Sequence, residues 1–353
     1  MGQRSLKTGV KRLAAYLARG ARALAGSLGV SGAVRPLVRR MFLSHTNIVY
    51  YHLIGERQPY YAPGRGGKCT VDQFARDIAG LKEVFTFTTL ERLCEYNRGG
   101  SAPDRPLLAL TFDDGFRLST PEVLQVLDDH GIKATQFLIT SCVGNSNLMW
   151  RNKIFAIQAM VPQSIYVPRY NVLAGRAGFA PIASGGDLQP ASSKWPMSQK
   201  DELADELWNA CGMPPLAEFL DEHRPYFSWK EVEDWLGAGH SVGLHTRTHP
   251  YCSRLTDEEI EAEIVRPGEE LRARFNLGFF PFSYPFGDRI AAAQEKALLE
   301  RRVIDCAFGN KGFARRGTAP HRLERAGIEG GGIDWPVFGR PAILYGLTGT
   351  AAR

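Results

Sequence analysis

The chain has 353 residues, enough for one large core or for one domain with a sizeable insertion. Hydrophobic residues make up 44% and charged residues 23%, which is ordinary for a soluble globular protein. The net charge is +6, but nine Lys and Arg residues precede Met41 and no acidic residue occurs before Glu56. The remainder is mildly acidic, so the composition gives no indication of nucleic acid binding by the body of the protein.

Residues 1–45 are expected to form a basic amphipathic arm. Leu and Val recur there at helical spacing, and Arg and Lys fill much of the rest. Such a helix could lie on an anionic membrane surface or dock a partner. The alternatives are a helix that packs on the domain and a partly disordered tail, and Gly20 and Gly26 weaken the helix.

Cellular location follows from what the sequence lacks. No apolar run approaches the roughly 18 residues of a membrane-spanning helix. Arg19, Arg22 and Arg35 interrupt every stretch that could serve as a secretory signal. The six cysteines are scattered and favour free thiols in a reducing compartment. We therefore expect a cytoplasmic protein, with peripheral contact at the inner face of the membrane through the arm as an option.

Residues 46–345 alternate short β-rich runs with helical patterns, which indicates a parallel sheet covered by helices. The runs end in polar residues, as at the active face of a (β/α) barrel. Pro267 predicts a kink or break in the last long helix. The expected strands are 47–51, 107–112, 134–140, 241–244, 279–284 and 303–308, and the expected helices are 71–84, 121–130, 229–238 and 256–274.

Residues 152–224 break this alternation. They are rich in Pro, Gly and Ser around residues 175–196 and carry no cluster of ligand-like side chains. We interpret them as an insertion over or beside the active face. The insertion could be a substrate-binding cap or a mobile loop.

Two motifs at strand ends indicate a metal site. Asp113 and Asp114 follow an apolar run, and His245 and His249 lie four residues apart much later in the chain. Either motif alone is weak, because an Asp-Asp-Gly is often only a turn. A hydrolytic metal site needs a few protein ligands, an open position for water and a base. Together the two motifs supply three ligands and a spare carboxylate.

A third motif completes a family pattern. Phe282-Ser283-Tyr284-Pro285-Phe286-Gly287, taken with the two motifs above, resembles the polysaccharide deacetylases, the NodB-homology family (carbohydrate esterase family 4). The resemblance covers roughly residues 48–308, interrupted by the insertion. It implies a distorted (β/α) barrel of the polysaccharide deacetylase type, with the insertion after the third strand. It also implies removal of acetyl groups from an amino sugar.

The resemblance assigns roles by position. Asp114, His245 and His249 look like ligands of a divalent metal, with zinc as the first expectation and cobalt or nickel as alternatives. Asp113 looks like the general base, and the backbone amide of Phe286 like an oxyanion donor. The chemistry agrees, since a metal such as Zn²⁺ lowers the pKa of bound water from 15.7 to roughly 7.

The general acid that protonates the leaving amine has two candidates. His321 lies in a late segment that does not clearly match the family's late histidine motif. His52 ends the first strand and resembles the Tyr-His motif of circularly permuted members. We prefer His52, because a strand end on the active face is where a catalytic side chain should emerge.

One position departs from the pattern. Many members carry an Arg where Ser283 stands, and that Arg pairs with the base aspartate. A Ser supplies no charge, so Asp113 must find another cation or work at a different pKa. Arg322 or Arg325 could reach it from the next strand.

The sequence leaves several substrate classes open. The leading hypothesis is deacetylation of N-acetylglucosamine-type units in a glycan. The alternatives are deacetylation or deformylation of a lipid-linked amino sugar at the membrane surface, and glycan binding without turnover. The residues expected to line the substrate groove are Tyr284, Trp150, Trp335, Arg322 and Arg325.

Overall fold

The computed structural model describes residues 39–40, 42–56, 58–63, 69–101, 103–117 and 121–328. Most of the expected N-terminal arm, and Trp335 in the C-terminal segment, lie outside the described residues. In the part of the chain that is described, no helix has both the length and the apolar character needed to cross a bilayer.

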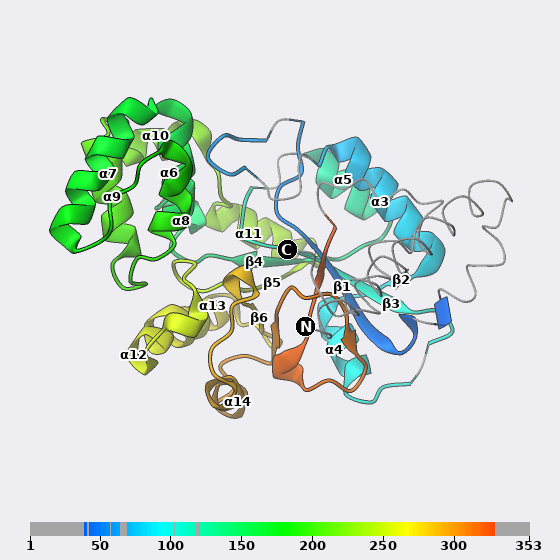
Figure 1. Cartoon of the computed structure of the whole chain (residues 1–353). Coiled ribbons are helices and arrows are strands. Elements are labelled where there is room, and N and C mark those ends of the chain that lie inside the picture. Colours follow the sequence, from blue (N-terminus) through cyan, green and yellow to red (C-terminus); the bar gives the residue numbers. More distant parts are fainter. Residues whose placement is uncertain are drawn as a thin grey trace, which may run out of the picture.

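The centre of the protein is one nine-stranded sheet in the order β7-β6-β5-β4-β3-β1-β8, with β2 on β3 and β9 on β1 (Figure 1). All pairs are parallel except that of β1 with β8. The strands are β1 (His45–Tyr51), β2 (Thr86–Phe87), β3 (Leu107–Phe112), β4 (Thr135–Leu138), β5 (Ser241–Leu244), β6 (Pro281–Ser283), β7 (Cys306–Phe308), β8 (Ala314–Arg315) and β9 (Ala326–Gly327).

A short late segment connects the two ends of this curled sheet. Leu323 forms a parallel bridge with Phe308 of β7, and β9 then pairs with β1. The segment from Leu323 to Gly327 therefore lies between β7 and β1. This arrangement is the distorted barrel that the sequence predicts, and it directs the side chain of Arg325 towards β3.

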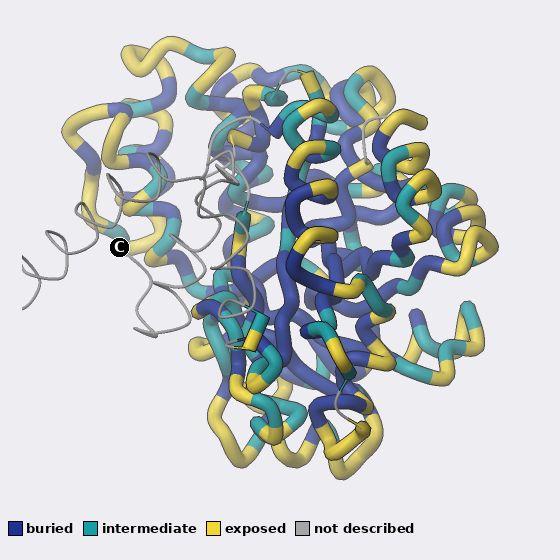
Figure 2. The backbone as a smooth tube through the Cα atoms, turned by 90° about the vertical axis from the view of Figure 1, so that its right-hand side faces the viewer, coloured by how far each residue is buried: buried dark blue, intermediate teal, exposed yellow. Residues whose placement is uncertain are grey.

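Helices cover the outside of the barrel, and their outward turns are exposed while the strands are buried (Figure 2). The predicted helices at 71–84, 121–130 and 229–238 are confirmed to within a residue. The other helices of the barrel are α4, α12, α13 and α14. The bounds are α3 (Val71–Val84), α4 (Leu90–Asn97), α5 (Pro121–Asp129), α11 (Trp229–Gly237), α12 (Asp257–Ile260), α13 (Arg266–Phe275) and α14 (Ala292–Glu300).

The helix with the internal proline begins as the sequence predicts. Thr256 caps it, and its side chain and that of Glu259 form a capping box. Before Pro267 the chain makes a π-helical turn, Glu261–Val265, and α13 starts directly after it. A proline has no N–H to donate to the helix, and the wider turn is the local adjustment in place of a break.

The insertion is helical. Between β4 and α11 it forms α6 (Trp150–Met160), α7 (Gln163–Ala177), α8 (Leu188–Ser192), α9 (Lys200–Ala210) and α10 (Leu216–His223). Figure 1 shows these helices as a group beside the sheet. They share an apolar cluster that includes Trp150, Trp195 and Trp208. The mobile-loop alternative is therefore wrong, because a loop would bury no core of its own. The many Gly, Pro and Ser residues end and connect short helices.

Candidate metal centre

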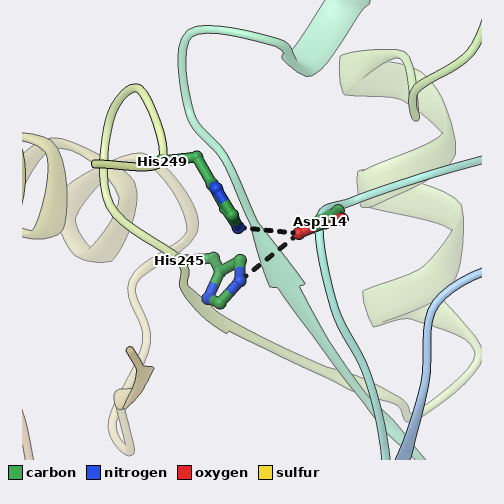
Figure 3. Close-up of side chains that lie close together, drawn as sticks. All are labelled: Asp114, His245 and His249. Atoms are coloured by element: carbon green, nitrogen blue, oxygen red, sulfur yellow. Dashed lines mark ion pairs between the residues drawn. The ribbon is translucent and has the colours of Figure 1, made fainter. Parts of the chain in front are cut away.

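Three potential ligands meet where two strands end. Asp114 follows β3, and His245 and His249 follow β5. Asp114 Oδ1 lies 3.3 Å from Nε2 of His245 and 3.3 Å from Nε2 of His249 (Figure 3). All three side chains are buried, and one potential ligand atom from each lies within 4.8 Å of the others.

The hydrogen bonding of His245 shows that this group fits a cation. Nδ1 of His245 lies 2.7 Å from the carbonyl oxygen of Ser283 and donates to it, so Nε2 carries a lone pair. That lone pair faces the acceptor oxygen of Asp114. Two acceptors at this distance repel each other, and a bound cation removes the repulsion. Two imidazole nitrogens and one carboxylate oxygen are also a ligand set found in catalytic zinc sites.

The acid–base properties of the set point in the same direction. Burial lowers the pKa of His249 to about 4, so its ring is neutral at pH 7 and able to act as a ligand. Burial also raises the pKa of Asp114, but the electrostatic effect of His249 leads the influences that outweigh burial and hold this pKa well below its usual value. The site therefore presents one carboxylate and neutral imidazole near neutral pH.

The backbone around the site is strained. Asp114, Thr246, His249 and Phe286 have φ values of 70°, 65°, 60° and 59°, in the left-handed region that residues other than glycine rarely adopt. Such conformations cost on the order of 1–3 kcal/mol each and persist where the surroundings hold them. One hydrogen bond that does so runs from the amide of His249 to Thr246 Oγ1 at 2.9 Å.

Asp113, which directly follows β3, forms a buried ion pair with Arg325. Nη1 and Nη2 of Arg325 donate to Oδ1 and Oδ2 of Asp113, each at 2.7 Å. Burial raises the pKa of Asp113, and Arg325, His245 and His52 more than offset this effect and lower it. Asp113 is therefore ionised at neutral pH, as a general base must be.

Arg325 takes over the role that Ser283 cannot perform. The guanidinium also donates to Ser283 Oγ at 2.5 Å and to Thr111 Oγ1 at 3.0 Å, and only 1% of Arg325 is exposed. Of the two arginines proposed from the sequence, Arg325 reaches the aspartate. Arg322 is exposed and pairs instead with Glu295 at 3.1 Å.

The two candidate acids lie in different surroundings. His52 follows β1, whose last residue, Tyr51, accepts a hydrogen bond from the amide of Asp113 at 2.9 Å. His52 is partly exposed and acts electrostatically on both aspartates. His321 is held through its carbonyl oxygen by Arg289 at 2.8 Å, on a short helical turn against α14.

Phe286 lies at a tight turn beside the metal ligands. Its ring packs edge-on against His249 at 4.5 Å and stacks on Tyr251 at 4.4 Å. The guanidinium of Arg151 lies 4.9 Å from the ring centre of Phe286. Gly287 has a φ of 67°, which favours glycine, and a Cβ there would displace the side chain of Asn310.

Three residues expected in the substrate groove are buried, and this expectation is corrected. Trp150 is fully buried, and its indole Nε1 donates to the carbonyl oxygen of His249 at 3.0 Å. Tyr284 is 1% exposed and packs against Phe282. Arg325 is committed to Asp113. Their side chains are packed in the interior and make contacts within the protein.

The histidine loop is held by residues that the sequence motifs do not point to. Thr248 donates through N and Oγ1 to the carboxylate of Glu263, at 2.8 and 2.5 Å. Lys200 of the insertion donates to Thr248 Oγ1 at 2.5 Å. Thr248 lies inside the histidine motif, and this position is a signal from which its role could be predicted. Glu263 and Lys200 look like ordinary residues of acidic helices.

Comparisons with solved structures agree with this fold. No curated protein sequence matches the chain. The Streptococcus pyogenes deacetylase PplD in complex with acetate is similar at 15% identity, 81% coverage of this chain, 92% coverage of that chain and a TM-score of 0.52. IcaB from Ammonifex degensii is similar at 16% identity, 86% and 97% coverage and a TM-score of 0.51. These likenesses establish the fold as a mixed α/β structure with a curled sheet.

The family itself is established by sequence. A family model described as polysaccharide deacetylase matches residues 100–300, which is more than half of the chain. The match includes both aspartates and both histidines of the site. Membership implies a hydrolase of amide bonds. The chain belongs to the polysaccharide deacetylase family.

Proposed function

We propose that this protein is a metal-dependent carbohydrate N-deacetylase that hydrolyses acetamide groups of N-acetylglucosamine-type units in a glycan. The observation that carries the proposal is the buried set of Asp114, His245 and His249 beside an ionised Asp113. A protein that only bound metal or glycan would have no use for the spare carboxylate. The Arg325 pair, which keeps that carboxylate ionised, has the same implication.

Each residue of the site has a distinct task in this proposal. A divalent metal held by Asp114, His245 and His249 would acidify water and polarise the acyl oxygen. Asp113 accepts the proton of the attacking water, and its ion pair with Arg325 holds it in place for this transfer. The other lone pairs of its two oxygens remain available, because each oxygen accepts one N–H from Arg325.

The remaining steps fall to two other residues of the site. His52, at the end of β1, protonates the leaving amine nitrogen as the C–N bond breaks. The backbone amide of Phe286 donates to the oxyanion that forms on the acyl carbon, and the strained turn at this residue fixes the direction of its N–H. Acetate and a free amino sugar are the products.

Tyr251 and Phe286 are the aromatic groups that we propose for sugar contact. Both are partly exposed and stacked on one another, and Phe286 touches the metal ligand His249. An aromatic face beside the reacting group can pack against a pyranose ring. These two rings replace Trp150 in that role.

The position of a basic hollow bears on the alternative of a lipid-linked sugar. It is lined by Arg40, Arg98, Arg315 and Arg316 and lies near the start of β1, where the basic arm joins the barrel. His52 lies at the other end of β1, roughly 20 Å away for a strand of this length. If the arm and this hollow bound an anionic membrane, the catalytic edge would face away from it.

An acyl-release screen tests the proposal. Purified protein is stripped with a chelator and resupplied with Zn²⁺, Co²⁺ or Ni²⁺, and acetate and formate are then measured. The substrates are chitooligosaccharides, exopolysaccharide fragments and lipid-linked amino sugars. We expect metal-dependent acetate release from an N-acetylated glycan. Folded protein that takes up none of the three metals would refute metal dependence, and metal uptake without any release would favour a binding protein.

A further inference from the structure

The two histidine ligands are held in different ways. The ring of His245 is fixed by the hydrogen bond from Nδ1 to Ser283, within the barrel. The Nδ1 atom of His249 is buried and has no hydrogen-bond partner among the residues that the structure describes. Its ring direction therefore depends on packing against Phe286 and on the backbone of its own loop.

That backbone is held from the insertion. The carbonyl oxygen of His249 accepts a hydrogen bond from the indole of Trp150 in α6. The preceding residue, Thr248, accepts a hydrogen bond from Lys200 in α9. Further along the loop, Arg254 donates to the carbonyl oxygens of Ser193, Lys194 and Trp195.

Thr248 is the point where this support converges. Its amide and hydroxyl both donate to Glu263, so the hydroxyl oxygen keeps a lone pair that accepts from Lys200. Lys200 is 1% exposed and has a second acceptor in Asp201 at 2.7 Å. A buried ammonium is stable only where acceptors surround it, so the structure fixes the relative positions of α9, the loop and the π-helical turn.

We propose that Lys200 is a positioning residue of the metal site, acting through Thr248 on His249, and that the insertion is therefore needed for full metal affinity. The proposal rests on the metal binding in the proposed function. Removing the lysine leaves Thr248 tied to Glu263 alone. The loop can then rotate as a unit with the helical turn, and His249 leaves the direction that Asp114 and His245 require.

The chain contains a matched control. Lys153 is also a fully buried lysine of the insertion, paired with Asp205 at 2.5 Å, and its ion pair does not include the histidine loop. Lys200→Met and Lys153→Met each remove a buried, paired ammonium. We expect Co²⁺ affinity to fall 10- to 100-fold in Lys200→Met, the range found when second partners of metal ligands are lost. In Lys153→Met it should stay within about twofold of wild type.

Titration of chelator-treated protein with Co²⁺, followed by its visible absorption spectrum, measures this affinity without turnover. A second pair of variants controls for misfolding: Thr248→Val keeps the shape but loses the hydroxyl, and Thr248→Ser keeps the hydroxyl. We expect weak binding with Val and near-normal binding with Ser. Equal affinities in the Lys200, Lys153 and Thr248 variants would overturn the proposal.

A measurement on the metal-free protein separates this proposal from the proposed function. Hydrogen exchange at the amide of His249, which donates to Thr246, should be at least tenfold faster in Lys200→Met than in Lys153→Met. Equal exchange in the two variants contradicts the positioning role. If the two variants differ in exchange as expected but the wild-type protein takes up no Co²⁺, the proposed metal function is contradicted and the positioning role is not.

Discussion

The barrel side and the insertion side of the metal site are built on different principles. On the barrel side, Asp113, Asp114 and His245 follow directly from β3 and β5, and the parallel register brings the ends of these strands to one edge. On the insertion side, His249 lies on a loop whose position depends on contacts with α6 and α9. The barrel side is thus fixed by the sheet, and the insertion side by side-chain hydrogen bonds.

This difference separates the residues proposed for proton transfer from the residues that set the direction of the second histidine. The proposed base, its cation and the first histidine are on the side fixed by the sheet, where a displacement would require a strand to move. The second histidine is on the side where one buried lysine or one indole can alter its direction. Changes on the barrel side should therefore affect turnover most, and changes on the insertion side should affect metal affinity.

The largest effect is expected for the base. Asp113→Asn should reduce deacetylation by about a thousandfold, because the amide cannot accept the proton of the water. Metal content, measured by atomic emission, should remain that of the wild type. Asp114→Asn is the matched control and should lose the metal. Turnover within tenfold of wild type in Asp113→Asn would show that another residue is the base.

The next largest effect is expected for the general acid, and it tests whether His52, at the end of β1, belongs to the barrel side of the site. His52→Ala should lower kcat by about a hundredfold, because the leaving amine then departs without a proton donor. His321→Ala should change kcat less than threefold. The two rates with the same glycan decide the assignment, and the reverse order would transfer the role to His321.

Arg325 tests whether the barrel side depends on its closing segment. Arg325→Met should reduce the free energy of unfolding by about 3–5 kcal/mol, because Asp113 is left buried and unpaired. The pKa of Asp113 should rise, so the acidic limb of the pH–rate profile moves to higher pH. Arg322→Met, which removes an exposed arginine that pairs with the buried Glu295 and not with Asp113, is the control and should leave the profile unchanged. An unshifted profile in Arg325→Met would contradict the ion pair.

The smallest effect concerns the start of β5. Burial, aided by Lys133, lowers the pKa of His240 to about 4, and its Nδ1 accepts from the amide of Ala134. The unfolded chain binds this proton near pH 6.5, so the folded state loses up to about 3 kcal/mol as the pH falls from 6.5 to 4. Urea unfolding of metal-free wild type and His240→Gln at pH 7 and 4.5 measures the difference. Parallel losses in both proteins would exclude His240 as the cause.

The barrel side could be predicted from the sequence to a large extent. Asp113, Asp114 and His245 end strands whose apolar runs are legible, and parallel strands place such ends together. The sequence limits the cation that pairs with Asp113 to two arginines, Arg322 and Arg325, but does not decide between them. Arg325 belongs to a segment with a two-residue strand, too short to give a pattern.

The insertion side could not be predicted. Lys200 and Thr248 are 48 residues apart, and their contact depends on how five short helices pack. The tryptophan at 150 was expected to meet a sugar, since nothing in the sequence tells a buried indole from an exposed one. Gly and Pro residues between the helices also concealed the regular structure.

The position of Arg325 has a consequence for the order in which the enzyme becomes competent. Asp113 and Arg325 are 212 residues apart, and the arginine directly precedes β9, the last strand that the structure describes. During synthesis the three proposed metal ligands emerge before Arg325, so the proposed base remains without its cation until this closing segment has been added.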